Sequence, residues 1–98
     1  MAAYVIYGRK DIFDPEKSAE YARRAVPQIK EYGGEIVTAR GQVQVLEGDW
    51  DPMMVTIIRF PGMEQLLTWY NSADYAPLKE LRLQSSHGDL VVIESVDH

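Results

Sequence analysis

The sequence of 98 residues contains no cysteine. Disulfide bonds, thiolate metal ligands and a cysteine nucleophile are therefore excluded. No apolar run approaches the ~20 residues that a membrane-spanning helix needs. No basic segment followed by a long apolar stretch precedes Tyr4, as a secretory signal would require. We therefore expect a cytoplasmic protein that does not cross a membrane.

Positive charge is scarce as well. Lys and Arg together number 10 against 15 Asp and Glu residues, for a formal net charge of -5. Basic residues are scattered except for the pairs Arg9-Lys10 and Arg23-Arg24. This balance argues against nucleic acid or an anionic membrane as a partner. An RNA-binding domain is disfavoured further, because the central strands lack the paired exposed aromatic residues on which bases stack.

Familiar catalytic and metal-binding signatures are also missing. The sequence has no glycine-rich phosphate loop, no nucleophile elbow and no zinc-ligand spacing. Only two histidines are present, and one of them, His98, is the last residue. Glu47, Asp49 and Asp51 cluster as hard-cation ligands do, but a solvated acidic loop is the favoured interpretation. We predict no metal site and no cofactor.

What is present fits one folded domain. With 46% apolar and 26% charged residues, the chain has an ordinary globular composition, and we assign residues 1–98 to a single domain. A β-branched and aromatic run over 4–8 predicts a first strand, which the polar segment 9–11 ends.

A long helix is predicted next. Asp14 is typical of a helix N-cap, and Pro15 is typical of the first helical position. Apolar residues then recur at helical spacing until Gly33-Gly34, which is typical of a helix end. These residues are Ala19, Ala22, Val26 and Ile29. Pro27 predicts a kink or a split near Val26.

The second half of the chain contains a hairpin, two short helices and a last strand. Residues 35–40 and 42–47 predict one strand with a bulge at Gly41, and residues 53–60 predict the strand that returns after a turn. Residues 63–70 predict a helix, and Pro77 begins a second helical piece. Residues 90–96 predict the last strand.

This element order is βαββαβ, which normally gives a ferredoxin-like α+β fold. Its sheet has four antiparallel strands, with both helices on one face. The predicted strands over 53–60 and 90–96 are apolar toward both faces, at Ile57 and Ile58 for example. Because the helices cover one face only, we expect a second copy of the chain to cover the other and form a homodimer.

A set of short motifs carries a family likeness over nearly the whole chain. In order, they are Tyr32-Gly33-Gly34, Arg40-Gly41, residues 45–50, Phe60-Pro61, residues 69–72, Tyr75 and Leu81-Arg82. The ordered set resembles domain-of-unknown-function family 1330, which in turn resembles the dimeric α+β barrel superfamily. The resemblance implies two ferredoxin-like sheets facing one another, with a cleft between sheet and helices in each protomer. The superfamily includes cofactor-independent monooxygenases, small-ring isomerases and haem-degrading enzymes, but the family has no assigned reaction.

Five side chains are candidates for ligand binding. They are Arg40, Trp50, Trp69, Tyr70 and Tyr75. Arg40 is expected in the middle of the sheet, where a guanidinium group needs a carboxylate from a ligand or from Glu47 or Asp49. The four aromatic residues can line a cleft for a flat apolar substrate, with core packing and dimer contacts as the alternative.

No catalytic residue is assigned. His87 is the one weak candidate, because an imidazole transfers protons near neutral pH, but a ring at a helix end before Gly88 is the favoured explanation. Two functional hypotheses remain. The protein acts on a small aromatic or acidic metabolite, or it is a non-catalytic ligand-binding or stress-related accessory dimer that uses the same cleft.

Overall fold

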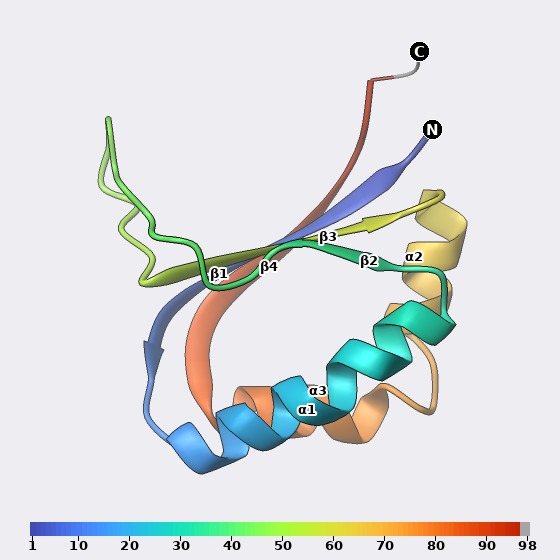
Figure 1. Cartoon of the computed structure of the whole chain (residues 1–98), viewed down its shortest axis with the longest axis horizontal. Coiled ribbons are helices and arrows are strands. Elements are labelled where there is room, and N and C mark those ends of the chain that lie inside the picture. The colour runs from blue at the N-terminus through green and yellow to red at the C-terminus, as the bar shows by residue number, and fades with distance from the viewer. Residues whose placement is uncertain (97–98) are drawn as a thin grey trace.

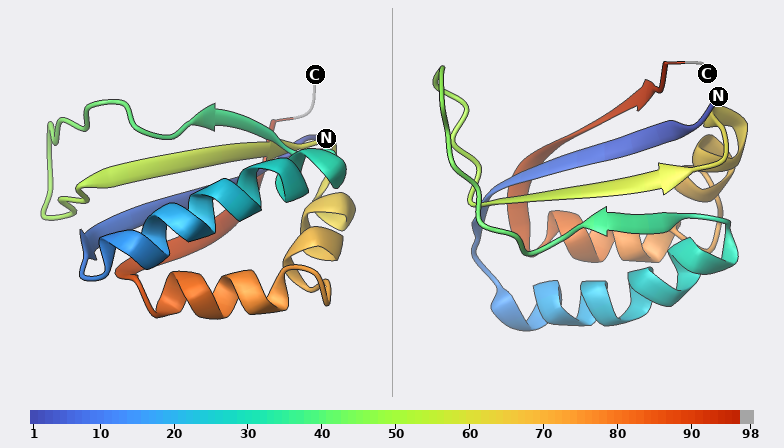
Figure 2. Two further views of the ribbon diagram at one scale, coloured as in Figure 1. Left: turned by 60° about the horizontal axis from the view of Figure 1, so that its bottom comes forward. Right: turned by 45° about the horizontal axis from the view of Figure 1, so that its top comes forward.

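The sheet and helices follow the predicted order in a computed structural model that describes residues 1–96. The elements are β1 (Ala3–Ile12), α1 (Pro15–Glu31), β2 (Glu35–Thr38), β3 (Met54–Phe60), α2 (Met63–Tyr70), α3 (Ala76–Leu83) and β4 (Ser86–Glu94). The strands form one antiparallel sheet in the order β2-β3-β1-β4, and the helices lie on one of its faces (Figures 1 and 2). The ferredoxin-like α+β fold is therefore confirmed. The prediction concerning His98 lies outside the described residues.

Helix α1 begins where the sequence predicts. The Asp14 side chain accepts a hydrogen bond from the Lys17 backbone nitrogen at 3.1 Å, and Pro15 opens the helix. Of the kink or split predicted near Val26, the split is wrong, because the helix runs continuously through Pro27 to Glu31. Pro27 and Arg23, whose carbonyl group loses its partner, are both exposed, so water can replace the missing hydrogen bond.

Strand β2 is shorter than predicted. It ends at Thr38, and residues 39–53, which we call the arm, form no strand, so the predicted strand over 42–47 with a bulge at Gly41 is wrong. The Thr38 hydroxyl donates to the Val55 carbonyl oxygen at 3.0 Å and accepts from the Ile57 nitrogen at 3.1 Å. It thereby occupies backbone groups of β3 that a longer β2 would need. The arm projects beyond the sheet (Figure 1).

The neighbouring strands β1 and β4 are both longer than predicted. Strand β1 continues through Arg9, which the sequence placed in a closing polar segment. Strand β4 begins at Ser86, so His87 lies in a strand and not at a helix end, which corrects that prediction. The two strands approach closely because Gly88 has no side chain, since a Cβ there would overlap the Gly8 carbonyl oxygen.

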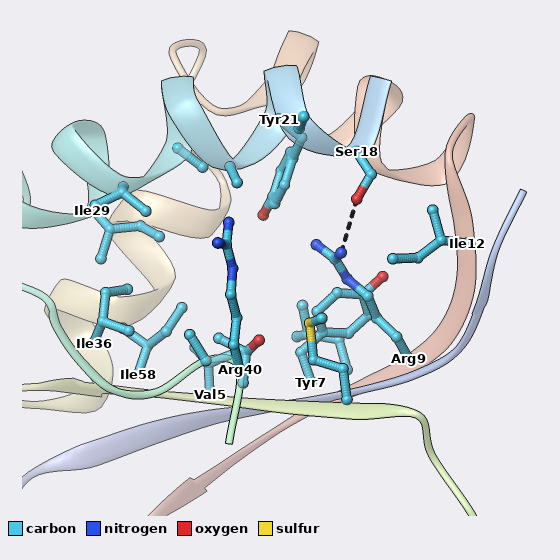
Figure 3. Close-up of a pocket in the computed structure, with 18 of the residues that line it drawn as sticks. Val5, Tyr7, Arg9, Ile12, Ser18, Tyr21, Ile29, Ile36, Arg40 and Ile58 are labelled. Carbon is cyan, nitrogen blue, oxygen red and sulfur yellow. Dashed lines mark hydrogen bonds between the residues drawn. The ribbon is translucent and has the colours of Figure 1, made fainter. Parts of the chain in front are cut away.

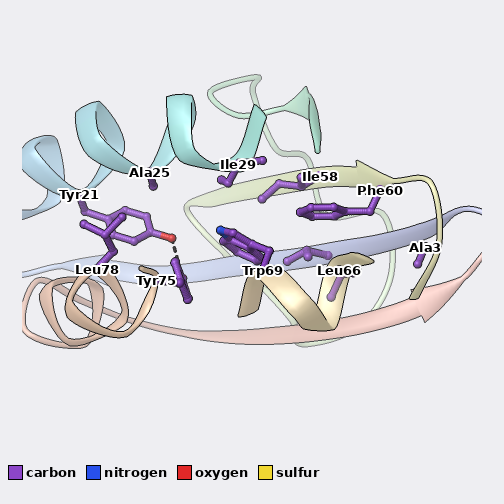
Figure 4. Packing of buried hydrophobic residues seen from close by; sticks show 11 residues of the cluster. Ala3, Tyr21, Ala25, Ile29, Ile58, Phe60, Leu66, Trp69, Tyr75 and Leu78 are labelled. Atoms are coloured by element: carbon purple, nitrogen blue, oxygen red, sulfur yellow. Dashed lines mark hydrogen bonds between the residues drawn. The ribbon is translucent and has the colours of Figure 1, made fainter. Parts of the chain in front are cut away.

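The hydrophobic core lies between the sheet and the helices (Figure 4). Its largest fully buried side chains include Trp69, Tyr75, Phe60 and Leu66. The rings of Phe60 and Trp69 stack with centroids 5.5 Å apart, and the Trp69 and Tyr75 centroids are 4.3 Å apart. Aromatic residues of β3, α2 and the segment before α3 thus hold the two short helices on the sheet.

The other face of the sheet carries no helix (Figure 2). Residues paired across antiparallel strands share a face, and Ile6 pairs with Ile57 and with Val91. We call this surface the open face; it comprises Tyr4, Ile6, Val55, Ile57, Val91 and Ile93. Val91 and Ile93 are 55% and 57% exposed, so a single chain presents apolar side chains to water here.

Candidate functional site

A pocket lies between α1 and the sheet, with a volume of about 340 Å³. This volume falls within the range of small-molecule sites. Residues of β1 and β3 form its floor, and α1 forms its roof (Figure 3). The roof includes Ala19, Ala22, Val26 and Ile29, which is the apolar stripe that the sequence indicates.

Small side chains on α1 create the space. Ser18, Ala22 and Ala25 follow one another at helical spacing on the surface of α1 that lines the pocket. A helix with larger residues here would pack directly on the sheet and fill the cavity. The pocket is therefore a consequence of the α1 sequence.

Arg9 is the most deeply placed charged residue of the pocket. It is 7% exposed, and its Nη1 donates to the Ser18 Oγ at 2.9 Å (Figure 3). Its guanidinium carbon lies 5.3 Å from the centroid of the Tyr7 ring. The Arg9 Nε is buried and has no hydrogen-bond partner. An arginine held in this way has donors left over for another molecule.

Arg40 enters the same pocket from the arm. It lies in an exposed bend just after β2 and not in the middle of the sheet, which corrects the predicted position. Thr38 is the reason, because it ends the strand before Arg40. The Arg40 side chain nevertheless lines the pocket, and its guanidinium group reaches toward α1 beside that of Arg9 (Figure 3).

Neither arginine has a carboxylate partner within the described part of the chain. Among residues 1–96, Arg24 pairs with Glu20, and the His87 ring lies 2.9 Å from an Asp11 carboxylate oxygen. The alternative that Glu47 or Asp49 pairs with Arg40 within the protomer is therefore not seen. No Asp or Glu stands among the described residues that line the pocket. The pocket is locally positive in a chain of net charge -5.

Arg82 is a second buried cation that lies against the Tyr7 ring. Arg82 is 6% exposed, and its guanidinium carbon lies 5.0 Å from the Tyr7 ring centroid. Burial by itself lowers the pKa of Arg82, but the neighbouring hydroxyl groups of Tyr75, Tyr7 and Tyr21 raise it overall. Arg82 therefore stays positively charged, and the Tyr7 ring contacts two guanidinium groups.

Tyr21 connects the pocket wall to the core. Its hydroxyl group lies 2.8 Å from that of Tyr75 in a buried hydrogen bond. Burial, followed by the nearby Tyr75 phenol, raises the pKa of Tyr21 well above the ordinary value of 10.0. Tyr21 is therefore a neutral phenol at physiological pH and does not act as a base.

Two of the five predicted ligand-binding residues line the pocket, namely Arg40 and Trp69. Tyr70 and Tyr75 pack on one another in the aromatic core, with ring centroids 5.7 Å apart, and lie outside the lining. Trp50 is 56% exposed and packs over Gly8 on the sheet face opposite the pocket. The predicted aromatic set is thus divided between the core and the two faces of the sheet.

His87 lies apart from the pocket. Its Nδ1 is 2.9 Å from the Asp11 carboxylate oxygen, and its ring centroid is 4.8 Å from that of Phe13. Its side chain is exposed. Its position gives no support to a catalytic role in the pocket.

Sequence reasoning missed Arg9, Tyr7 and Ser18. A signal was present, because Val5, Tyr7 and Arg9 continue one strand alternation. An uninterrupted strand places all three on the same face, which is the face that carries the helices. Ser18 likewise precedes Ala22 and Ala25 at helical spacing.

Residues 1–96 include no group of three or more His, Asp or Glu side chains that can hold a metal ion. Over the same residues, no helix has the length and apolar character needed to span a bilayer. The predicted cytoplasmic location remains a prediction.

Several solved structures share this fold. A protein of unknown function from Rhodopseudomonas palustris superposes with a TM-score of 0.79 at 17% identity, over 99% of this chain and 84% of that one. SnoaB, a cofactor-independent oxygenase from Streptomyces nogalater, superposes with a TM-score of 0.66 at 12% identity, over 99% of this chain and 94% of that one. A putative antibiotic biosynthesis monooxygenase from Nitrosomonas europaea superposes with a TM-score of 0.59 at 13% identity, over 99% of this chain and 100% of that one. At these identities the similarity concerns the fold alone.

A family model gives the relationship by sequence. No curated protein matches the chain. The model of the family described as Domain of unknown function (DUF1330) matches residues 2–96. Since this match spans nearly the whole sequence and confirms the resemblance carried by the short motifs, the chain belongs to the DUF1330 family.

Proposed function

We propose that the protein binds a small organic anion, with one acidic group on an apolar body, in the pocket between α1 and the sheet. The observation that supports this most is the presence of Arg9 and Arg40 in a pocket whose described lining contains no carboxylate. A bound anion supplies the negative charge that the lining lacks and forms charge-assisted hydrogen bonds with the guanidinium groups.

The apolar part of the lining favours an apolar body on the ligand. Ile29, Ile36, Ile58 and Trp69 form the region away from Ser18. Each Å² of apolar surface that the ligand removes from water here contributes roughly 25 cal/mol to binding. Such a pocket discriminates against small inorganic anions, which have no apolar surface to bury.

Catalytic turnover is a second candidate function, and the types of residue that line the pocket limit the kind of reaction that can take place there. The described lining residues include no Asp, Glu, His or Lys, so no side chain suited to proton removal at neutral pH is at hand. Two guanidinium groups can stabilise negative charge that develops on a bound molecule. A reaction here would depend on the acidity of the substrate itself, and SnoaB, of similar fold, is described as a cofactor-independent oxygenase. Product formed in air from a bound acid, detected by mass spectrometry, would distinguish an enzyme from a binding protein.

We infer in addition that the protein is a homodimer whose two open faces cover one another. Val91, Ile93 and Trp50 are exposed apolar residues on that side of the sheet. Antiparallel sheets with one face on a core usually have a polar second face. A second copy removes these side chains from water with no further partner.

The binding proposal is tested by calorimetric titration with matched acids and amides. Benzoate, phenylacetate, 2-naphthoate, hexanoate and octanoate are each compared with the neutral amide of the same body. We expect at least one acid to bind, with its amide at least about 10-fold weaker, because the amide loses a charge-assisted interaction.

A pocket-filling variant provides the structural control. Ala22→Phe places a ring in the cavity and should abolish binding, whereas Ala73→Phe, at an exposed position outside the lining, should bind as the wild type does. The proposal is wrong if no acid binds up to about 10 mM, an affinity too weak for specific recognition. It is also wrong if acids and amides bind equally, or if Ala22→Phe leaves binding unchanged.

A further inference from the structure

The guanidinium group of Arg9 is held in one orientation before any ligand binds. Ser18 accepts one of its hydrogen bonds at 2.9 Å, from α1. The Tyr7 ring supports it at 5.3 Å, and the Tyr7 hydroxyl lies 2.9 Å from the Ser86 Oγ, which fixes the ring. Elements α1, β1 and β4 thus position one charged group. Preorganisation of this kind lowers the entropy that binding must offset.

The charge of Arg9 has no counterpart in the described chain. Arg9 and Arg82 are both more than nine-tenths buried, and the Nε atom of each is buried without a hydrogen-bond partner. No Asp or Glu among residues 1–96 lies within 4.0 Å of either guanidinium group. Burying an unpaired cation is costly, and buried charges in proteins are as a rule paired. The two arginines therefore leave a local excess of positive charge beside the pocket.

The Arg40 side chain is less constrained than that of Arg9. It comes from the arm and is exposed, and it forms no ion pair with a carboxylate among residues 1–96. Its guanidinium group reaches into the pocket from the side opposite Ser18 (Figure 3). A fixed buried donor and an adjustable exposed donor therefore approach the same space.

We propose that Arg9 is the principal anchor for the ligand and binds a carboxylate with its free donors, while Arg40 contacts the bound carboxylate from the pocket mouth. This assignment rests on the proposed function and makes it specific, since it names the chemical group and the atoms that receive it. A planar carboxylate matches the fork of guanidinium donors. Ser18 acts as a positioning residue, because it touches Arg9 and not the ligand.

An anchoring role for Arg9 affects the stability of the unliganded protein. If Arg9 is present for binding, its unpaired buried charge destabilises the empty protein. Replacing it with an apolar residue of similar length should weaken binding without lowering the melting temperature of the empty protein. A purely structural arginine would show the opposite pattern, with lower stability and unchanged affinity.

The test measures affinity and stability on the same variants. The ligand is the tightest binder among benzoate, phenylacetate, 2-naphthoate, hexanoate and octanoate. We expect Arg9→Met to weaken binding by roughly 10- to 100-fold, and Arg40→Met by less, because Arg40 is exposed to solvent. Arg9→Lys should lie between Arg9→Met and the wild type, since it keeps the charge and loses the fork. Arg23→Met, on the exposed side of α1, is the matched control and should bind normally.

Melting temperature without ligand is the second readout. Arg9→Met should melt at or above the wild-type temperature. The anchor assignment is overturned if Arg9→Met folds and binds as the wild type does. A melting temperature of Arg9→Met well below that of the wild type refutes the claim that the unpaired charge destabilises the empty protein. If Arg9→Met does not fold, the stability claim fails. The affinities of the single variants Arg9→Lys and Ser18→Ala then decide whether Arg9 is the anchor. Acid binding that Ala22→Phe blocks and Arg9→Met leaves intact would refute the anchor and keep the proposed function. Absence of acid binding in the wild type would refute both.

Discussion

The hydroxyl oxygens of Tyr21 and Tyr75 lie 2.8 Å apart, and their hydrogen bond joins the middle of α1 to the residue that precedes α3. Tyr75 is fully buried, whereas Tyr21 also lines the pocket. The wall of the candidate site is therefore connected to the aromatic core by one polar contact. Loss of that contact should affect folding and the shape of the pocket together.

Removing one of the two hydroxyl groups should destabilise the protein. Tyr21→Phe leaves the buried Tyr75 hydroxyl unpaired, which costs about 1–3 kcal/mol of unfolding free energy. The double variant Tyr21→Phe with Tyr75→Phe should recover part of this loss, because no unpaired group remains. Urea unfolding followed by circular dichroism measures both values. A Tyr21→Phe variant as stable as the wild type would show that the bond contributes nothing.

Alkaline pH should weaken the fold through Tyr21. The pKa of Tyr21 is raised in the folded protein above its ordinary value of 10.0, first by burial and then by Tyr75. A raised folded pKa means that the stabilisation is fully present below the unfolded pKa and is lost as pH rises through the folded pKa. Unfolding free energy should therefore fall between about pH 10 and the folded pKa of Tyr21. Tyr21→Phe should show a smaller fall over the same pH range, and an equal fall would contradict this assignment.

Two glycines should respond oppositely to alanine. A Cβ on Gly88 would overlap the Gly8 carbonyl oxygen and crowd the Arg9 Cα, so β1 and β4 would have to move apart. We expect Gly88→Ala to cost about 1–3 kcal/mol, as overpacking does. Gly41, in the arm, has no atom within 4 Å of its would-be Cβ. Gly41→Ala should be neutral or slightly stabilising. Thermal unfolding of both variants measures the two effects. Equal effects of the two changes would mean that the strands are not in close contact at Gly88.

The open face should determine the oligomeric state. We expect the wild type to sediment as a dimer at micromolar concentration. Val91→Lys, on the open face, should give a folded monomer, because a charge must then be desolvated in the interface. Leu83→Lys, an exposed position on α3, is the matched control and should remain dimeric. A monomeric wild type, or a dimeric Val91→Lys variant, would remove the open face as the dimer interface.

Local sequence signals predict the helices of this fold well. Asp14 and Pro15 give the start of α1, and residues 63–70 give α2 in full, because caps and helical spacing depend on neighbours in sequence. The split expected from Pro27 is wrong because the sequence does not show that this part of the helix faces water, which replaces the missing hydrogen bond. The ferredoxin-like order of elements follows from these signals together with the turn residues.

The errors concern contacts between distant residues. The end of β2 depends on the Thr38 hydroxyl meeting Val55 and Ile57 of β3, which no local pattern reveals. Arg9 reads as a polar residue after a strand, and its pairing with Met54 of β3 and Gly88 of β4 places it within β1. As a result, the family resemblance implies a cleft between sheet and helices, and the sequence singles out Arg40, but Arg9, the buried arginine of the pocket, is missed.

The most direct test of this account is a crystal structure of the protein with the tightest-binding carboxylic acid. We predict that the carboxylate oxygens lie within hydrogen-bond distance of the Arg9 guanidinium, that Arg40 contacts the same group, and that the apolar body lies against Ile29 and Ile36. An acid bound elsewhere, such as beside Arg59 on the opposite side of the sheet, would contradict it. So would an acid in the pocket whose carboxylate points away from Arg9.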